Sequence, residues 1–188
     1  MSEIKIIDGI LSSTLCRQLI DKFNNDTFLK SDPQPDYSTR RFLLVSEQLQ
    51  WQKEVIKLTP IISEVVTDFF NYPGKFSAHS REDWVDDGLV MAHYRPGDTC
   101  AFHDDGQVYG CNVRLATVLF YLNDVDQGGE TYFPLQDLKI CPKEGRAVVF
   151  PPHLRFPHEV LEASSDRYIL QTWICDPALI VLAEHEDM

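Results

Sequence analysis

The stretch that decides the fold runs from Tyr94 to Trp173 and opens with Tyr-Arg-Pro-Gly-Asp-Thr-Cys-Ala-Phe-His-Asp-Asp over residues 94–105. Short β-rich segments follow it at close intervals, and turn residues such as Asn-Asp, Gly-Gly and Lys-Glu-Gly separate them. Many short strands with turns between them are typical of a barrel or a double-sheet jelly roll. We expect strands over residues 89–94, 100–103, 114–122, 131–133, 138–140, 146–150, 156–160 and 167–175.

The first half of the chain has the apolar period of helices. One helix is expected from residues that recur every four positions, with Ser12 or Ser13 as its cap: Leu11, Leu15, Leu19 and Phe23. A second helical period runs through residues 52–70, where Pro60 predicts a kink or a restart. Short strands are expected over 3–7 and 41–45, with irregular loops over 24–38 and 71–88.

These patterns predict one α+β, mainly β domain over residues 1–188. Its core over 88–176 would be a double-stranded β-helix, or jelly roll. The helices of residues 1–87 would pack on one sheet of that core, and residues 177–188 would form an acidic tail.

Charge and composition exclude several classes of partner. The formal net charge of −12 opposes binding to nucleic acid, because such binding relies on clustered Lys and Arg. No apolar run approaches the ~20 residues needed to span a bilayer, and the N-terminus lacks the pattern of a signal peptide. Five widely spaced cysteines without a Cys-x-x-Cys pair suit a reducing compartment. We therefore expect a cytoplasmic protein that binds neither membrane nor nucleic acid.

A metal site is predicted at His103, Asp105 and His158. Two histidines and one carboxylate on one face of an ion leave open positions for substrate and oxygen, as in non-heme Fe(II) oxygenases. Residues i and i+2 of a strand point to the same side, so His103 and Asp105 could share an ion while Asp104 would point away. We expect His158 to come from a later strand on the far side of the sheet.

The spacing alone carries no weight, because about one His-x-acid match is expected by chance in this composition. A second match begins at His185, but no strand follows it. His153 competes with His158 as third ligand, although it follows Pro-Pro in an expected loop. No chemistry is assigned to His79 or His93.

Arg167 is the predicted anchor for an organic acid. It heads a strand that alternates Arg167, Ile169, Gln171, Trp173 and Cys175 on one face. A buried guanidinium is costly unless an anion meets it. That anion could be an Asp or Glu of this chain or a ligand carboxylate bound bidentately. The hydroxyl of Tyr121 is a second contact for such a ligand.

Taken together, these residues resemble the prolyl 4-hydroxylase-like group of Fe(II)- and 2-oxoglutarate-dependent dioxygenases. The resemblance covers residues 94–173 and rests on motifs in one register: Tyr94, Gly97, His103, Asp105, Tyr121-Leu122-Asn123-Asp124, Gly128-Gly129-Glu130-Thr131 and His158. It implies that Fe(II) binds to the predicted triad and that Arg167 binds the distal carboxylate of 2-oxoglutarate, supported by Tyr121 and Tyr94. It also implies O2 as cosubstrate, ascorbate as a reductant, and no catalytic residues beyond the metal ligands.

One departure from the group concerns the residue that anchors the cosubstrate. Collagen-type and plant-type members generally use Lys one position later, where this chain has Tyr168, whereas Arg167 resembles oxygen-sensing and many bacterial relatives. Retention of Asp105, in place of the small residue found in related halogenases, favours hydroxylation.

The resemblance implies hydroxylation of an unactivated C–H bond in a prolyl or other amino-acid-like substrate, free or peptidyl, with succinate and CO2 as coproducts. Residues nominated for substrate binding are Arg114, Arg40, Arg41 and Trp84. Two alternatives stay open: a non-catalytic jelly-roll domain that binds a metal or organic acid, and a nucleic-acid demethylase, which the acidic balance disfavours.

Overall fold

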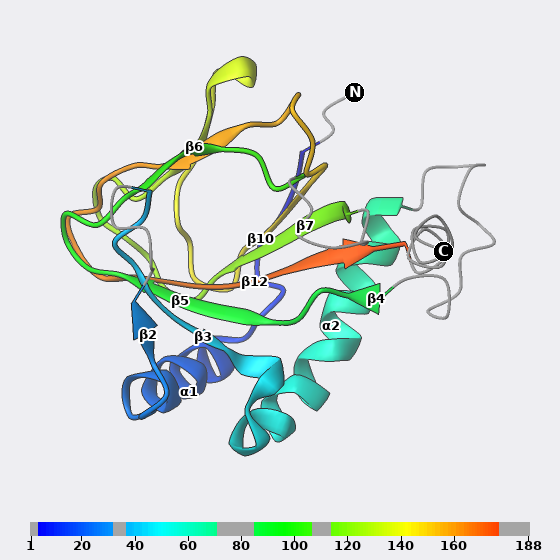
Figure 1. Ribbon diagram of the computed structural model, residues 1–188, viewed down its shortest axis with the longest axis vertical. Helices are drawn as coiled ribbons and strands as arrows, with labels where there is room; N and C mark the ends of the chain where they lie inside the picture. Colours follow the sequence, from blue (N-terminus) through cyan, green and yellow to red (C-terminus); the bar gives the residue numbers. More distant parts are fainter. Residues whose placement is uncertain (1–3, 32–36, 71–84, 107–113, 177–188) are drawn as a thin grey trace, which may run out of the picture.

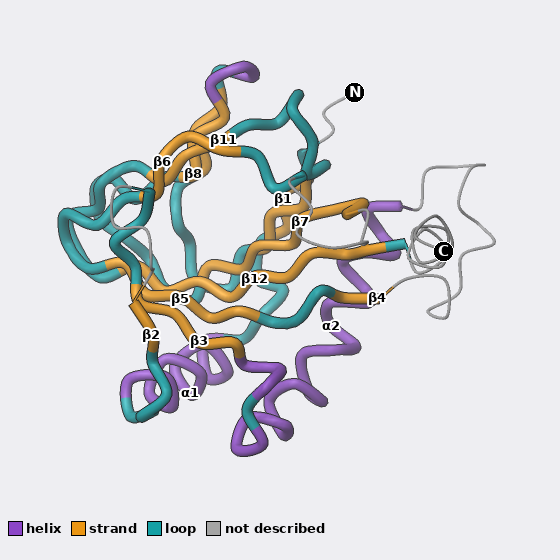
Figure 2. The backbone as a smooth tube through the Cα atoms, viewed as in Figure 1, coloured by secondary structure: helices purple, strands orange, loops and turns teal. Residues whose placement is uncertain are grey.

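The computed structural model describes residues 4–31, 37–70, 85–106 and 114–176. Within these ranges two antiparallel sheets face each other, and two helices lie against the outer face of the larger sheet (Figures 1 and 2). This is the jelly roll with helical support that the strand spacing predicts. Trp84, the tail and parts of the expected loops lie outside the described residues.

The larger sheet has eight strands. Their order is β1 (Lys5–Ile7), β10 (Ala147–Phe150), β7 (Arg114–Tyr121), β12 (Arg167–Cys175), β5 (Val90–Tyr94), β3 (Arg41–Leu44) and β2 (Lys30–Ser31), while β4 (Val85–Asp86) also pairs with β12. The smaller sheet has the order β6 (Cys100–His103), β11 (His158–Val160), β8 (Thr131–Phe133) and β9 (Leu138–Ile140). The strands β2 and β4 fall in stretches predicted to be irregular, because two residues are too few to show an alternating pattern.

The two helices begin and continue largely as their sequences predict. Helix α1 spans Ser13–Asn24, and the Ser12 hydroxyl caps it by accepting a hydrogen bond from the backbone N–H of Leu15. Helix α2 spans Gln52–Phe70 and runs through Pro60 without a restart. The carbonyl that loses its partner there belongs to Ile56, which lies on the exposed side of the helix where water can bind it. The described residues also form short 3-10 turns over Val45–Glu47, Leu49–Trp51 and Pro134–Gln136. None of the helices described is both long and apolar enough to cross a membrane.

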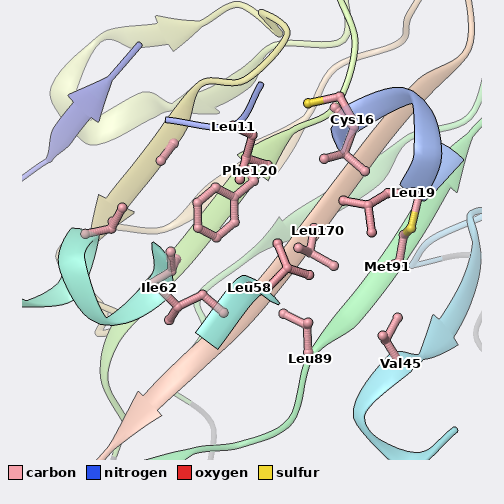
Figure 3. Packing of buried hydrophobic residues seen from close by; sticks show 14 of the residues in the cluster. Leu11, Cys16, Leu19, Val45, Leu58, Ile62, Leu89, Met91, Phe120 and Leu170 are labelled. Atoms are coloured by element: carbon pink, nitrogen blue, oxygen red, sulfur yellow. The ribbon is translucent and has the colours of Figure 1, made fainter. Parts of the chain in front are cut away.

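The larger sheet buries both of its faces, because successive residues of its strands point to opposite sides. Its outer face, with Phe120 and Leu170, packs against Leu19 of α1 and Leu58 of α2 (Figure 3). The inner face packs against the smaller sheet in a second cluster that includes Leu119, Tyr121, Ile169, Phe133 and Val160. The helices thus occupy the outer face and leave the space between the sheets for the site.

A Gly-Gly turn holds the loop that precedes β8. Gly128 and Gly129 have φ values of 75° and 70°, which residues with a side chain rarely adopt. A Cβ on Gly128 would lie 2.0 Å from the carbonyl oxygen of Glu162, and one on Gly129 would lie 3.3 Å from Cδ of Arg167. The prediction that these glycines serve turn geometry is consistent with both values.

Gly128→Ala and Gly9→Ala should therefore differ in stability. Gly9 has a similar φ of 70°, but nothing lies within 4 Å of the point that a Cβ would occupy there. Gly9→Ala should cost about 1 kcal/mol from backbone strain, or about 2–4 °C in Tm. Gly128→Ala should lower Tm at least twice as much, because backbone atoms must also move apart. Thermal unfolding followed by circular dichroism measures both, and equal losses would contradict the close approach.

Candidate metal centre

The two histidines of the predicted triad lie on neighbouring strands of the smaller sheet. Strand β11 pairs with β6 so that His158 stands directly opposite His103. The prediction that His158 would come from the far side of the sheet is wrong, because the two strands are adjacent. Their ring centroids are 4.4 Å apart. Backbone pairing thus sets the spacing of the two imidazoles.

Each histidine ring is oriented by its own local backbone. Nδ1 of His103 is 2.7 Å from the carbonyl oxygen of Ala101, and Nδ1 of His158 is 3.2 Å from that of Phe156. A carbonyl can only accept a hydrogen bond, so both Nδ1 atoms carry the proton. In the neutral form of each ring, Nε2 is then free of hydrogen and available to a metal, which is the usual arrangement of ligating histidines.

Asp105 lies beyond the end of β6, which stops at His103. The alternation of a strand, on which the prediction for this pair was based, therefore does not extend to Asp105, although the structure does bring the two side chains together. The carboxylate is held from the opposite sheet, because Oδ2 accepts a hydrogen bond of 2.7 Å from the Thr117 hydroxyl of β7. Its backbone carbonyl accepts another, of 2.9 Å, from Arg114. Asp104 is not part of this group: it lines the outer cavity, and its Oδ1 accepts a hydrogen bond from the N–H of Gly106.

The three groups form a donor set that fits a divalent metal ion. Nε2 of His103 is 3.7 Å from Oδ1 of Asp105, and Nε2 of His158 is 3.8 Å from Oδ2. These distances are too long for hydrogen bonds. All three ligand atoms lie within 4.8 Å of one another. Two imidazoles and one carboxylate gathered in this way match the facial triad of non-heme iron sites.

Burial and neighbouring charges set the protonation of the two histidines. Burial lowers the pKa of His158, even though Asp105 acts in the opposite direction. Burial also acts against protonation of His103, but the Cys100 thiol and the Asp105 carboxylate outweigh it and raise the pKa of that ring. A neutral His158 is the form that a metal ion binds.

Arg167 is the most deeply buried charged group near the triad, with 1% of its surface exposed. Its guanidinium lies between the rings of Tyr94 and Tyr121, at 4.8 Å and 5.2 Å from their centroids. One nitrogen, Nη2, donates to the Thr131 hydroxyl at 3.1 Å. Nε and Nη1 are buried without a partner. Among the described residues no carboxylate pairs with Arg167. Its guanidinium group is therefore available to the carboxylate of a ligand.

The two tyrosines predicted to support a cosubstrate hold different positions. The Tyr121 hydroxyl hydrogen-bonds with that of Thr131 at 2.6 Å and donates to the carbonyl of Ile140. Tyr94 lines the cavity in front of Arg167, and its hydroxyl accepts from Arg40 at 3.3 Å. Burial raises the pKa of both phenols, which keeps them neutral. Tyr121 thus acts on the guanidinium through Thr131 and its ring, and it is not among the residues that line the cavity.

Two connected cavities meet at the triad. A narrow inner cavity extends between the sheets toward Arg167, and a wider outer cavity opens beyond the metal ligands. Four residues line both cavities: Tyr37, His103, Asp105 and Trp173. The outer one is bordered by exposed apolar side chains, namely Phe102, Leu135 and Leu154. The metal site therefore faces a polar, closed side and an apolar, open side.

The residues nominated for substrate binding are distributed over different parts of the site. Arg40 lines the inner cavity, and Arg114 lines the outer one while it binds Asp87 and stacks on Trp173 at 4.1 Å. Arg41 is turned to His93, with Nη2 2.6 Å from Nδ1 of that ring. His93 in turn stacks on Tyr168 on the helix side of the sheet.

The structure also contains site residues that the sequence did not single out. Thr117 orients Asp105, Thr131 contacts Arg167, and Tyr37 packs edge-on against His103 at 5.2 Å. Thr131 belongs to the Gly-Gly-Glu-Thr motif, which could have identified it as a site residue. Thr117 and Tyr37 had no such signal, because their roles depend on contacts between distant segments.

A jelly roll that carries a His-Asp-His triad beside a buried Arg, for which the described residues offer no carboxylate partner, matches the arrangement of non-heme iron oxygenases. The family model of the 2OG-Fe(II) oxygenase superfamily matches residues 89–175, which contain the triad and Arg167. Over these residues the chain is similar to that superfamily.

Relatives of the chain include prolyl 4-hydroxylases of plants and animals. Prolyl 4-hydroxylase 5 of Arabidopsis thaliana is 37% identical over 79 residues, which cover 34% of this chain and 27% of that protein. The alpha-1 subunit of prolyl 4-hydroxylase from Gallus gallus is 31% identical over 93 residues, or 48% of this chain and 18% of that subunit. The chain thus spans about a quarter or less of these relatives.

Solved prolyl hydroxylases share the fold over nearly the whole chain. The enzyme of Trichoplax adhaerens, solved with a peptide fragment of the hypoxia inducible factor oxygen degradation domain, superposes with a TM-score of 0.78 at 20% identity, covering 97% of this chain and 87% of its own. The viral collagen prolyl hydroxylase of Paramecium Bursaria Chlorella virus-1, solved with 2OG, gives 0.68 at 23% identity, with 93% and 97% covered.

Asp105→Ala should abolish most metal binding, whereas Asp104→Ala should retain it. Only Asp105 shares ligand distances with both histidines, and removing outer partners of a metal site alone costs about 10–100-fold in affinity. We expect Mn(II) affinity, measured by calorimetry, to fall by more than about 100-fold for Asp105→Ala and by less than about 3-fold for Asp104→Ala. The reverse order would overturn the assignment of the carboxylate ligand.

Proposed function

We propose that this chain is an Fe(II)- and 2-oxoglutarate-dependent dioxygenase. It hydroxylates an unactivated C–H bond of a prolyl or other amino-acid-like substrate, free or peptidyl, and forms succinate and CO2. The observation that carries the proposal is the buried Arg167 guanidinium, which has two unpartnered nitrogens in the cavity that leads to the triad. A guanidinium fork is shaped for bidentate binding of a carboxylate, and 2-oxoglutarate has one at its distal end.

The residues of the chain divide the work between binding and orientation. His103, Asp105 and His158 would hold Fe(II), which with 2-oxoglutarate supplies the activation of O2 and the coupled decarboxylation. Thr117 keeps one carboxylate oxygen directed by a hydrogen bond. Arg167, oriented by Thr131, fixes the distal end of the organic acid. The buried walls of the inner cavity exclude water from the reacting end.

The outer cavity is proposed to receive the substrate. It shares Trp173, His103 and Asp105 with the inner cavity, so a substrate there would present its C–H bond at the triad. Phe102, Leu135 and Leu154 provide exposed apolar surface that suits a prolyl ring and its neighbours. The apolar border also makes a nucleic-acid substrate a poor fit, in line with the net charge of −12.

Succinate formation from 2-oxoglutarate is the primary test of the proposal. The Fe(II)-loaded protein in air should form succinate slowly without a substrate and faster with a suitable prolyl peptide, with ascorbate included as reductant. His103→Ala, which removes a ligand, should reduce the rate to that of free Fe(II). Absence of His103-dependent succinate under every condition, despite metal binding, would favour the non-catalytic binding domain instead.

Arg167→Met should weaken 2-oxoglutarate binding by about 10- to 100-fold, since a charge-assisted hydrogen bond contributes about 1.5–3 kcal/mol. Met retains most of the side-chain volume and removes a buried charge that lacks an ion-pair partner, so Tm should stay equal or rise. Calorimetric titration of the Mn(II)-loaded protein with 2-oxoglutarate measures the affinity without turnover. Unchanged affinity would mean that Arg167 is a structural residue.

A further inference from the structure

Gln171 is a buried polar residue whose side chain has no partner among the described residues. It lies on β12 and lines the inner cavity together with Arg167, Ile169 and Trp173 of the same face. Only 9% of its surface is exposed. Thr172, its neighbour on the opposite face, is by contrast bonded through its hydroxyl to the carbonyl of Gly88 at 2.9 Å.

The pairing of β12 with β7 places Gln171 beside the metal centre. Gln171 pairs with Leu119, and Trp173 pairs with Thr117, whose hydroxyl holds the Asp105 carboxylate. Side chains on one face at such diagonal positions are about 7–8 Å apart at their backbones, within reach of a long side chain. Gln171 is therefore at the metal end of the inner cavity.

Arg167 marks the other end of the same cavity. It lies four residues before Gln171 on the same face of β12, a separation of about 13 Å between Cα atoms. Both side chains line the cavity that lies between these two positions. An extended dicarboxylic acid held by Arg167 would thus present its second end near Gln171.

The Gln171 side chain lines the cavity without a hydrogen bond to any described residue, so its amide is open to a ligand there. The metal-side end of 2-oxoglutarate has a carboxylate and a 2-oxo group, whose oxygens only accept hydrogen bonds. The side-chain NH2 of Gln171 supplies the matching donors. We propose that Gln171 binds the cosubstrate by donating a hydrogen bond to the metal-side end of the acid that Arg167 anchors, an inference that rests on the proposed function.

The test compares Gln171→Met with Thr172→Val as a control on the same strand. Calorimetry gives the affinity of each variant for Mn(II) and, once the variant is loaded with Mn(II), its affinity for 2-oxoglutarate without turnover. Gln171→Met, close in volume but without donors, should bind 2-oxoglutarate about 10-fold more weakly and leave Mn(II) affinity unchanged. Its Tm should stay close to that of the wild type, because no hydrogen bond to a described residue is lost and Met fills a similar volume. Thr172→Val should leave 2-oxoglutarate affinity unchanged, even if its Tm falls.

The different failures can be told apart. Wild-type 2-oxoglutarate affinity in Gln171→Met, with the Arg167→Met loss still observed, would overturn the role of Gln171 alone. An equal loss of affinity in Thr172→Val would also overturn it, because the effect would then come from distortion of β12. No binding of 2-oxoglutarate to the wild-type protein, or binding that does not depend on Arg167, would overturn the proposed function itself.

Discussion

The structure depends on a buried charge that no carboxylate of the described residues neutralises. Arg167 is nearly inaccessible, lies between two tyrosine rings and has a single hydrogen bond to a neighbouring side chain. A guanidinium in such a place destabilises the folded chain unless an anion joins it. The surrounding structure supports this residue closely: the Gly-Gly turn leaves room for its stem, and Thr131 and Tyr121 form one hydrogen-bonded unit beside it.

The two sheets are arranged so that the buried arginine and the metal ligands face the same space. The larger sheet carries the arginine on a central strand, and helices cover the opposite face of that sheet. The smaller sheet contributes both histidines on adjacent strands, where backbone hydrogen bonds fix their separation. A binding space between two packed sheets is thereby closed at the charged end and open at the apolar end.

Local patterns made much of this predictable from the sequence. Alternation in residues 167–175 indicated that Arg167 is buried, and turn residues located the strands of the jelly roll. Long-range pairing was beyond such patterns, so His158 was expected on the wrong side of the sheet. The two-residue strands β2 and β4 have no alternation to detect. Neither Thr117 nor Gln171 belongs to a motif. The contact of Thr117 with Asp105 and the position of Gln171 in the cavity depend on segments that are distant in the sequence.

The metal ligands belong to two different bodies of the fold. His103 and His158 move with the smaller sheet, while the carboxylate of Asp105 is tied to the larger sheet through Thr117. The relative positions of the three ligand groups therefore depend on the distance between the two sheets. Any ligand that changed the spacing of the sheets would also change the position of the carboxylate relative to the two imidazoles, without touching any of the three residues.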